Sequence, residues 1–132
     1  MKISEAIRNG SKNSRHVSQD YFWREGGQIG ACALGAAFLA VASPMNRERA
    51  LKLTENPETV ENPGTRKMQA FDLADTVLDE AWGWELEDFP ITVKTKEGPF
   101  ETFNLKQAII YLNDDLDWTR ERIADFLERQ GL

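Results

Sequence analysis

The sequence offers very little thiol or imidazole chemistry. Its 132 residues contain one cysteine, Cys32, and one histidine, His16. A single cysteine cannot form an internal disulfide, so no covalent cross-link stabilises the chain. We therefore expect a reducing, cytoplasmic location rather than secretion.

Long apolar runs are also missing. The longest, residues 29–42, includes glycines and is shorter than the roughly 20 residues that cross a bilayer. Glu5 and Arg8 interrupt the N-terminal stretch in which a signal peptide needs a continuous apolar core. The sequence therefore predicts no membrane anchor and a chain that is mature from Met1.

Positive charge is scarce. The chain has 16 lysines and arginines against 22 acidic residues, which gives a net charge of -6. Residues 72–88 contain no basic side chain, and their acids are Asp72, Asp75, Asp79, Glu80, Glu85, Glu87 and Asp88. Such a segment repels phosphate backbones and anionic lipid, because both bind proteins through cationic side chains. Direct binding to nucleic acid or to a membrane is not expected.

The composition, 41% hydrophobic and 29% charged, is typical of a globular protein, and the length fits a single domain over residues 1–132. Hydrophobic periodicity and capping residues predict that most of the chain is helical. The expected helices are 3–8 with Ser4 as cap and an end at Asn9-Gly10, 31–42, 46–53 with Asn46 as cap, 65–82, one from 105 capped by Asn104, and one after its cap Thr119 that stops at Gly131.

Shorter segments connect these helices. Residues 91–95 and 100–103 alternate in hydrophobicity and predict a β-hairpin with Lys94 opposite Glu101. The segment 21–23 should be briefly extended, residues 11–18 should form a polar linker, and residues 55–64, with their Asn-Pro pairs, a loop.

Together these elements predict a mainly α fold. We expect a compact helical domain around a central apolar helix, residues 31–42, with one small β-hairpin at about residues 91–103. The helix 65–82 and the C-terminal helix pair should flank the central helix. Gly35 in the central helix should admit the close approach of a neighbouring helix.

The C-terminal segment Trp118–Leu127 resembles the first helix of a helix-turn-helix. Only five residues follow it in the sequence, so we expect no recognition helix and no DNA-reading role.

Three segments together resemble a loose group of small uncharacterised proteins from bacteria, phages and integron-type mobile gene cassettes. They are residues 3–11, the Cys-Ala-Leu-Gly-Ala-Ala stretch from Cys32, and residues 113–127 with the motif Trp-Thr-Arg-Glu-Arg-Ile-Ala-Asp-Phe-Leu. The resemblance implies a cytoplasmic accessory protein carried by mobile DNA, with Cys32 and Gly35 at a packing position, and implies no activity. Phe126 departs from the pattern, in which tryptophan is frequent.

Cys32 and His16 are the candidate catalytic pair. A cysteine at a helix N-terminus can have a lowered thiol pKa, and His16 is the one available histidine base. The alternative is a buried cysteine between two alanines that only fills space, with His16 in a polar stretch without fixed geometry.

Metal and cofactor sites are not expected. Residues 113–121 alternate oxygen ligands as a calcium loop does, but Trp118 stands where that loop needs glycine and Ala124 where it needs glutamate. The three carboxylates Asp72, Asp75 and Asp79 have no histidine nearby and suit a solvated helix face. The glycines at 26, 27 and 30 match no phosphate-binding fingerprint.

Trp82 and Trp84, on either side of Gly83, are the candidate anchors of a partner surface that includes Asp72, Asp75 and Asp79. They could equally cover the edge of the hairpin as core residues. We expect a non-enzymatic module that binds another protein or itself, for instance as a homodimer. The alternatives are a small-molecule-binding protein or minor enzyme with an apolar pocket, and an acidic regulator of a nucleic-acid-binding partner.

Overall fold

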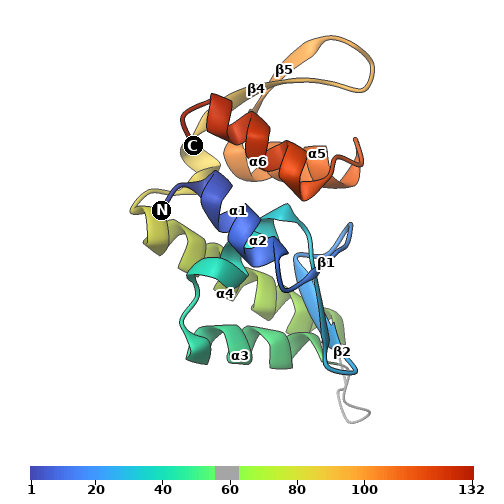
Figure 1. Ribbon diagram of the computed structural model, residues 1–132, viewed down its shortest axis with the longest axis vertical. Helices are drawn as coiled ribbons and strands as arrows, with labels where there is room; N and C mark the ends of the chain where they lie inside the picture. The colour runs from blue at the N-terminus through green and yellow to red at the C-terminus, as the bar shows by residue number, and fades with distance from the viewer. Residues whose placement is uncertain (56–62) are drawn as a thin grey trace.

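The computed structural model describes residues 1–55 and 63–132 and is mainly helical with some β structure (Figure 1). Its elements are α1 (Ile3–Ser11), β1 (Arg15–His16), β2 (Phe22–Glu25), β3 (Gln28–Ala31), α2 (Ala33–Val41), α3 (Pro44–Thr54), α4 (Pro63–Trp82), the short 3-10 helix η1 (Leu86–Asp88), β4 (Pro90–Lys94), β5 (Phe100–Asn104), α5 (Leu105–Asp114) and α6 (Arg120–Arg129). Among the helices of the described ranges, none has the length and apolarity needed to cross a membrane.

The helix α2 is enclosed by other elements. Its residues 33–38 are buried, and it contacts α1, α4, α5 and β3. The helix begins at Ala33 rather than Ala31, because residues 28–31 form a strand and Cys32 occupies the N-cap position. An all-apolar segment of this kind avoids water on every side, which explains why its neighbours pack around it.

Two glycines let backbones approach α2 closely. Gly10 lies inside α1 and is buried, and a Cβ there would overlap the backbone carbonyl of Ala36. The expected helix end at Gly10 was therefore wrong, since this glycine is a packing position between α1 and α2. A Cβ on Gly35 would overlap the carbonyl of Tyr21, so the close neighbour of Gly35 is the segment before β2 and not a helix.

The first turn of α1 is hydrogen-bonded to the C-terminal residue, Leu132. Ser4 is buried in the first turn, and both its backbone N–H (3.3 Å) and its hydroxyl (2.7 Å) donate to the carbonyl of Leu132. The predicted cap at Ser4 was wrong, because Lys2 holds the N-cap position and the Ser4 hydroxyl is used in this long-range contact.

A three-stranded sheet, in the order β1-β3-β2, was not predicted. His16 on β1 pairs in parallel with Ala31 on β3, and Phe22 on β2 pairs with Ala31 from the other side. The predicted linker 11–18 thus contains a strand, while the predicted extended segment 21–23 overlaps β2. The turn between β2 and β3 uses Gly26 (φ 56°) and Gly27 (φ 80°), a conformation that glycine adopts without steric cost.

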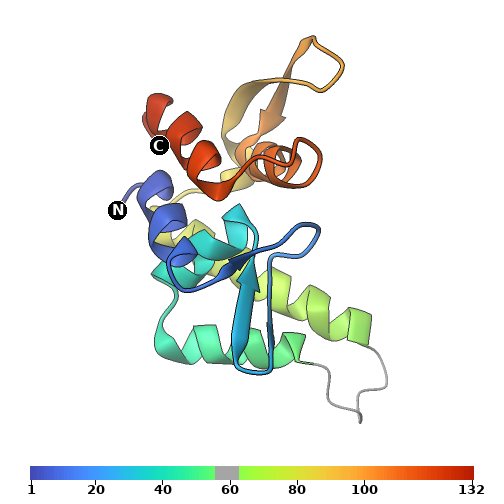
Figure 2. The same cartoon turned by 45° about the vertical axis from the view of Figure 1, so that its right-hand side comes forward.

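Helices α3 and α4 pack against each other, and α3 also contacts β2 (Figure 2). The cap of α3 is Ser43, whose hydroxyl accepts from the backbone N–H of Asn46 at 3.1 Å, so the predicted cap at Asn46 was wrong. Pro44 follows as the first helical residue, where its missing N–H costs nothing. The predicted loop 55–64 lies mostly outside the described residues, and α4 already begins at Pro63.

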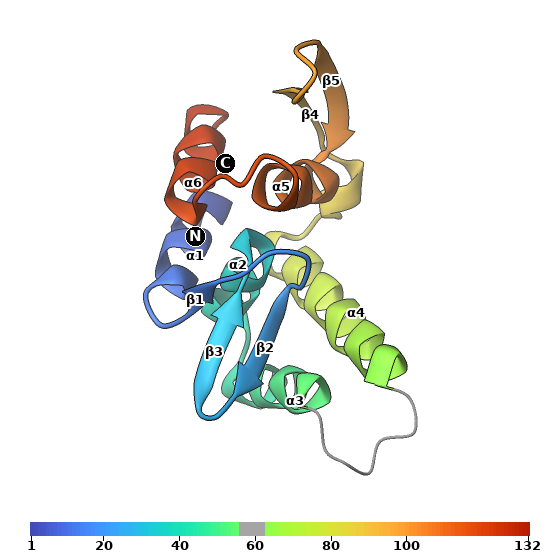
Figure 3. The same cartoon turned by 90° about the vertical axis from the view of Figure 1, so that its right-hand side faces the viewer.

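The strands β4 and β5 form the predicted hairpin, which projects from the helices in Figures 1 and 3. Its register differs from the expectation: Lys94 pairs with Phe100, and Glu101 pairs with Val93. The reason is a connection of five residues instead of four, closed by a hydrogen bond from Thr95 N–H to the Pro99 carbonyl at 2.9 Å. The buried residues of β4 are Ile91 and Val93.

The two C-terminal helices begin at the predicted caps, and α6 also ends as predicted, whereas α5 continues to Asp114. The Asn104 side chain accepts from the backbone N–H of Gln107 at 2.8 Å, and that of Thr119 from Arg122 at 3.1 Å. Gly131 (φ 84°) ends α6, and the Leu132 N–H bonds the Leu127 carbonyl. The side of α6 is held to α1 by Arg8, which pairs with Glu121, Asp125 and Glu128.

Replacing Gly10 with alanine should destabilise the fold. The added methyl group has no space against the Ala36 backbone, and overpacking of this kind costs about 1–3 kcal/mol even though alanine favours helix. Urea unfolding followed by circular dichroism measures the change. Asn9→Ala, at the exposed neighbouring position, should stay within about 0.5 kcal/mol of the wild type. A Gly10→Ala variant as stable as the wild type would contradict this account of the α1–α2 contact.

Candidate functional site

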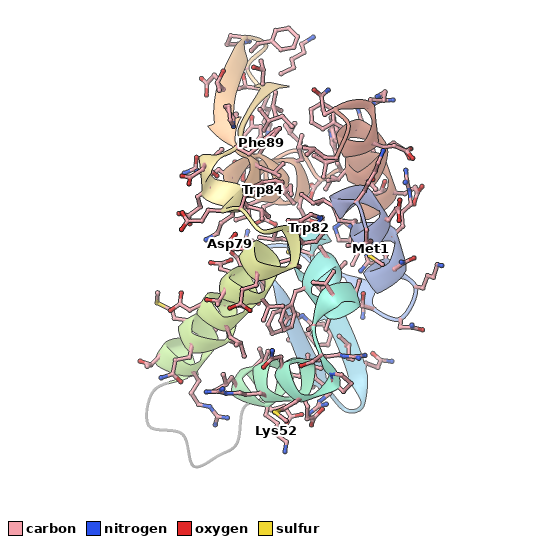
Figure 4. The ribbon with its side chains drawn as sticks, turned by 90° about the vertical axis from the view of Figure 1, so that its left-hand side faces the viewer. Met1, Lys52, Asp79, Trp82, Trp84 and Phe89 are labelled. Carbon is pink, nitrogen blue, oxygen red and sulfur yellow. The ribbon has the colours of Figure 1, made fainter. Side chains whose placement is uncertain are left out.

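The two tryptophans of the candidate surface lie at the C-terminal end of α4. Trp82 is the last residue of that helix, is half-buried, and donates its indole N–H to the carbonyl of Met1 at 3.0 Å. Figure 4 shows Trp82 directed toward Met1 and away from Trp84. Gly83, with φ 75°, ends the helix and separates the two rings.

Trp84 packs against a different aromatic side chain. Its ring lies 5.4 Å from that of Phe89, centroid to centroid, at an angle of 33°. These two residues stand on either side of η1 in the sequence, and Leu86 of η1 is buried. Trp84 and Phe89 remain half-buried, so part of each ring is available at the surface.

The three acidic residues of α4 that were predicted to lie on one solvated face have different surroundings. Asp72 is exposed, whereas Asp75 and Asp79 are half-buried. Asp79 accepts a hydrogen bond from the backbone N–H of Leu86 at 3.0 Å and so fixes the start of η1. The expected solvated face was wrong for Asp75 and Asp79, because α5 and η1 cover this end of α4.

Asp75 lies in the most unusual electrostatic environment of the site. Lys106 on α5 donates to Asp75 Oδ2 at 2.7 Å and to Glu87 at 3.1 Å. The second oxygen, Asp75 Oδ1, is buried and has no hydrogen-bond partner within the described residues. Burial raises the pKa of Asp75, and the ion pair with Lys106 only partly offsets this effect.

Tyr21 and Lys106 complete this cluster. Burial raises the pKa of the Tyr21 hydroxyl, and the charge of Asp75 raises it further. Burial is the largest single influence on the pKa of Lys106 and lowers it. The hydrogen bonds to Asp75 and Glu87 and the charges of Tyr21 and Asp75 together outweigh burial, and the pKa is raised. A cavity of about 10 Å³, lined by Leu34 and Leu86 among others, adjoins the pair and has room for one water molecule. The cluster therefore joins α4 to α5 and leaves no space for a larger ligand.

The surface that remains is formed by residues 80–89 and is called here the acidic aromatic face. Its aromatic part consists of Trp82, Trp84 and Phe89. Its exposed carboxylates are Glu80, Glu85 and Asp88, while Glu87 is occupied by Lys106. An aromatic centre with a charged rim is typical of protein interaction sites.

Cys32 and His16 both lie near the N-terminal end of α2 but are hydrogen-bonded to different partners. The Cys32 sulfur accepts from the backbone N–H of Gly35 at 3.4 Å, and the residue is almost completely buried. Burial raises the pKa of the Cys32 thiol to about 12, so desolvation outweighs the helix N-terminus. The His16 ring bonds Asn113 Oδ1 at 2.7 Å, and within the described chain no hydrogen bond joins His16 to Cys32.

Asn113, the first residue of the segment compared with a calcium loop, is fully buried in α5. Its oxygen also accepts from the Ala33 N–H at 3.1 Å, and its amide group donates to the Val17 carbonyl at 3.1 Å and to Asp114. Arg120 has a similar role, donating to the carbonyls of Ser14 (2.7 Å) and Ala31 (3.3 Å). Leu105, Ile109 and Asn113 follow one another at intervals of four residues, and this spacing was the sequence signal that Asn113 lies on the buried face of its helix.

Comparisons with protein-family models, with curated proteins and with solved structures find no match. The resemblance to proteins of mobile gene cassettes therefore stays a prediction.

Native Cys32 should react very slowly with iodoacetamide at neutral pH. Its thiol is buried and has a raised pKa, so the reactive thiolate is rare. Mass spectrometry after a timed exposure should find one added group in urea and almost none in buffer. Rapid labelling of the folded protein would support the catalytic pair instead.

Asp75→Asn should change how stability depends on pH. Because burial raises the pKa of Asp75, the folded chain keeps this proton to a higher pH than the unfolded chain does. The contribution of Asp75 to stability is complete below the unfolded pKa of about 3.9 and falls as the pH rises through the folded value. As the pH rises from the unfolded pKa of about 3.9 through the folded value, the wild type should therefore lose stability relative to the variant.

The measurement is urea unfolding at several pH values. Asp72→Asn, one turn earlier and exposed, is the matched control and should alter stability at neutral pH by less than about 0.5 kcal/mol. A gap between wild type and Asp75→Asn that stays constant or moves the other way would show that Lys106 dominates the pair.

Proposed function

We propose that this protein is a non-enzymatic accessory module that binds another protein through the acidic aromatic face. The observation that carries the proposal is the contact between half-exposed Trp84 and Phe89, in a segment whose carboxylates Glu80, Glu85 and Asp88 are exposed. Large aromatic side chains that keep part of their surface in water are frequent anchors of protein interfaces. The cytoplasm is the proposed location.

The charge of the face specifies the partner. Residues 72–88 contain no lysine or arginine, and the nearby Lys106 is already shared by Asp75 and Glu87. The exposed carboxylates therefore favour a partner surface with basic side chains around an apolar centre. Rim charges of this kind accelerate association and make it sensitive to salt.

Several features favour binding over catalysis. The Cys32 thiol is buried with a raised pKa, and His16 is held by Asn113. The cavity beside Asp75 has a volume of about 10 Å³, which is too small for a substrate. These features support a module whose fold, arranged around α2, presents a surface instead of a reaction centre.

The test compares three forms of the protein as bait in a host lysate at two salt concentrations. The face variant is Glu80→Lys, Glu85→Lys and Asp88→Lys together. The control variant is Glu5→Lys, Glu25→Lys and Glu97→Lys, which makes the same change of net charge at exposed positions elsewhere. A specific partner should be retained by the wild type and the control and reduced at least about tenfold with the face variant, since each disfavoured charge contact costs 1 kcal/mol or more.

The retained partner should also protect Trp84 from acrylamide quenching when the two purified proteins are mixed. Retention of every specific partner by the face variant at wild-type level would overturn the proposal. Loss of binding with both variants would indicate that net charge alone is responsible.

A further inference from the structure

The β4–β5 hairpin presents two sheet edges, one along each strand. In the described ranges, 1–55 and 63–132, its sheet has two strands, and no third strand pairs with either. The hairpin extends away from the helices, so its edges can be approached from outside (Figures 1 and 3). An edge strand offers a row of free N–H and C=O groups to another strand.

The register identifies which backbone groups face outward. Bonds from Leu105 N–H to the Phe89 carbonyl and from Thr95 N–H to the Pro99 carbonyl lie at the two ends of the ladder. Hydrogen-bonded pairs alternate along an antiparallel ladder, so the pairs that contain Ile91 and Val93 point inward. The outward groups belong to Pro90, Thr92 and Lys94 on β4 and to Phe100, Thr102 and Asn104 on β5.

The two edges differ in how they are protected. The β4 edge starts with Pro90, which has no N–H to donate, and ends with Lys94, and both residue types discourage edge pairing. The β5 edge has neither. Phe100 on β5 is 69% exposed although it is large and apolar, and Thr102 beside it is also exposed. The β5 edge is therefore the one open to pairing.

Charge favours a second copy of this chain as the occupant. The whole chain carries a net charge of -6, which opposes contact between copies over most of its surface. Residues 90–104 carry two positive charges, Lys94 and Lys96, and two negative charges, Glu97 and Glu101, so the hairpin is neutral. Its projection from the helices lets two copies meet there while the acidic parts stay apart.

We propose that two copies of this chain pair through their β5 edges as antiparallel strands, with Thr102 of both copies on the two-fold axis. This register pairs outward groups with outward groups and places Glu101 opposite Phe103 of the second copy. A register centred on Glu101 would set like charges opposite each other, which destabilises a strand pair. The result is a four-stranded sheet that continues across the two copies.

The contact is small, so the association is weak. A five-residue strand with one exposed phenylalanine buries less area than a standard stable interface of about 1,600 Å². The weight-average mass should therefore rise from the monomer value of 15.0 kDa toward twice that value only at high concentration. Sedimentation equilibrium between about 10 μM and about 1 mM covers the range expected for such an interface.

Two matched proline variants separate the edges. Thr102→Pro removes an outward N–H from β5, and Thr92→Pro removes one from β4 at the position directly opposite. Both variants lose the same hydroxyl contact between Thr92 and Thr102, 3.3 Å long, so their internal damage is alike. The association constant should fall at least about tenfold with Thr102→Pro and less than about twofold with Thr92→Pro.

Amide exchange in the unmodified protein provides a second measurement that does not depend on a variant folding. Raising the concentration should slow exchange at Thr102 and Asn104 and leave Thr92 and Lys94 unchanged. A wild type that stays monomeric at about 1 mM, or equal loss or equal retention of association in the two proline variants, would overturn the proposal. The lysine variant of the acidic aromatic face should still self-associate, so the two proposals can fail separately.

Discussion

The buried amide of Asn113 joins parts of the chain that are far apart in sequence. Its oxygen bonds the first turn of α2 and the ring of His16 on β1, and its amide group bonds the carbonyl of Val17. A fully buried amide is tolerated only when its groups find partners, so these contacts must form together. They set the position of α5 against α2 and the sheet, and through α5 they place the hairpin, η1 and the acidic aromatic face.

Local signals in the sequence located most of the helices and the hairpin but did not indicate the three-stranded sheet. The caps at Asn104 and Thr119 and the stop at Gly131 were predicted correctly because each depends on residues within one turn. The strand β1 has two residues and acquires its partner β3 fifteen positions later, which no local pattern indicates. Gly10 was assigned to a helix end by propensity, whereas its contact with Ala36 is a tertiary constraint.

The candidate surface was predictable in composition but not in arrangement. Helical spacing brought the acids of α4 to one side, yet only the neighbouring η1 and α5 decide that Asp75 and Asp79 are half-buried. Lys106 was missed because nothing in its own segment marks it as the partner of a carboxylate 31 positions earlier. The Trp84–Phe89 pair was visible as an aromatic cluster in the sequence, and the turn through η1 brings the two rings together.

The backbone contact between Gly10 and Ala36 also determines how the molecule can fluctuate. Side chains that interdigitate can accommodate a small movement by changing rotamers. Two helices in direct backbone contact cannot accommodate a movement in this way. Helices α1 and α2 must therefore separate as one cooperative unit, at close to the free energy of global unfolding. Local opening at low free energy is therefore expected at the periphery. The projecting hairpin has few helical neighbours, so it is the element that can open most readily while the interior stays folded.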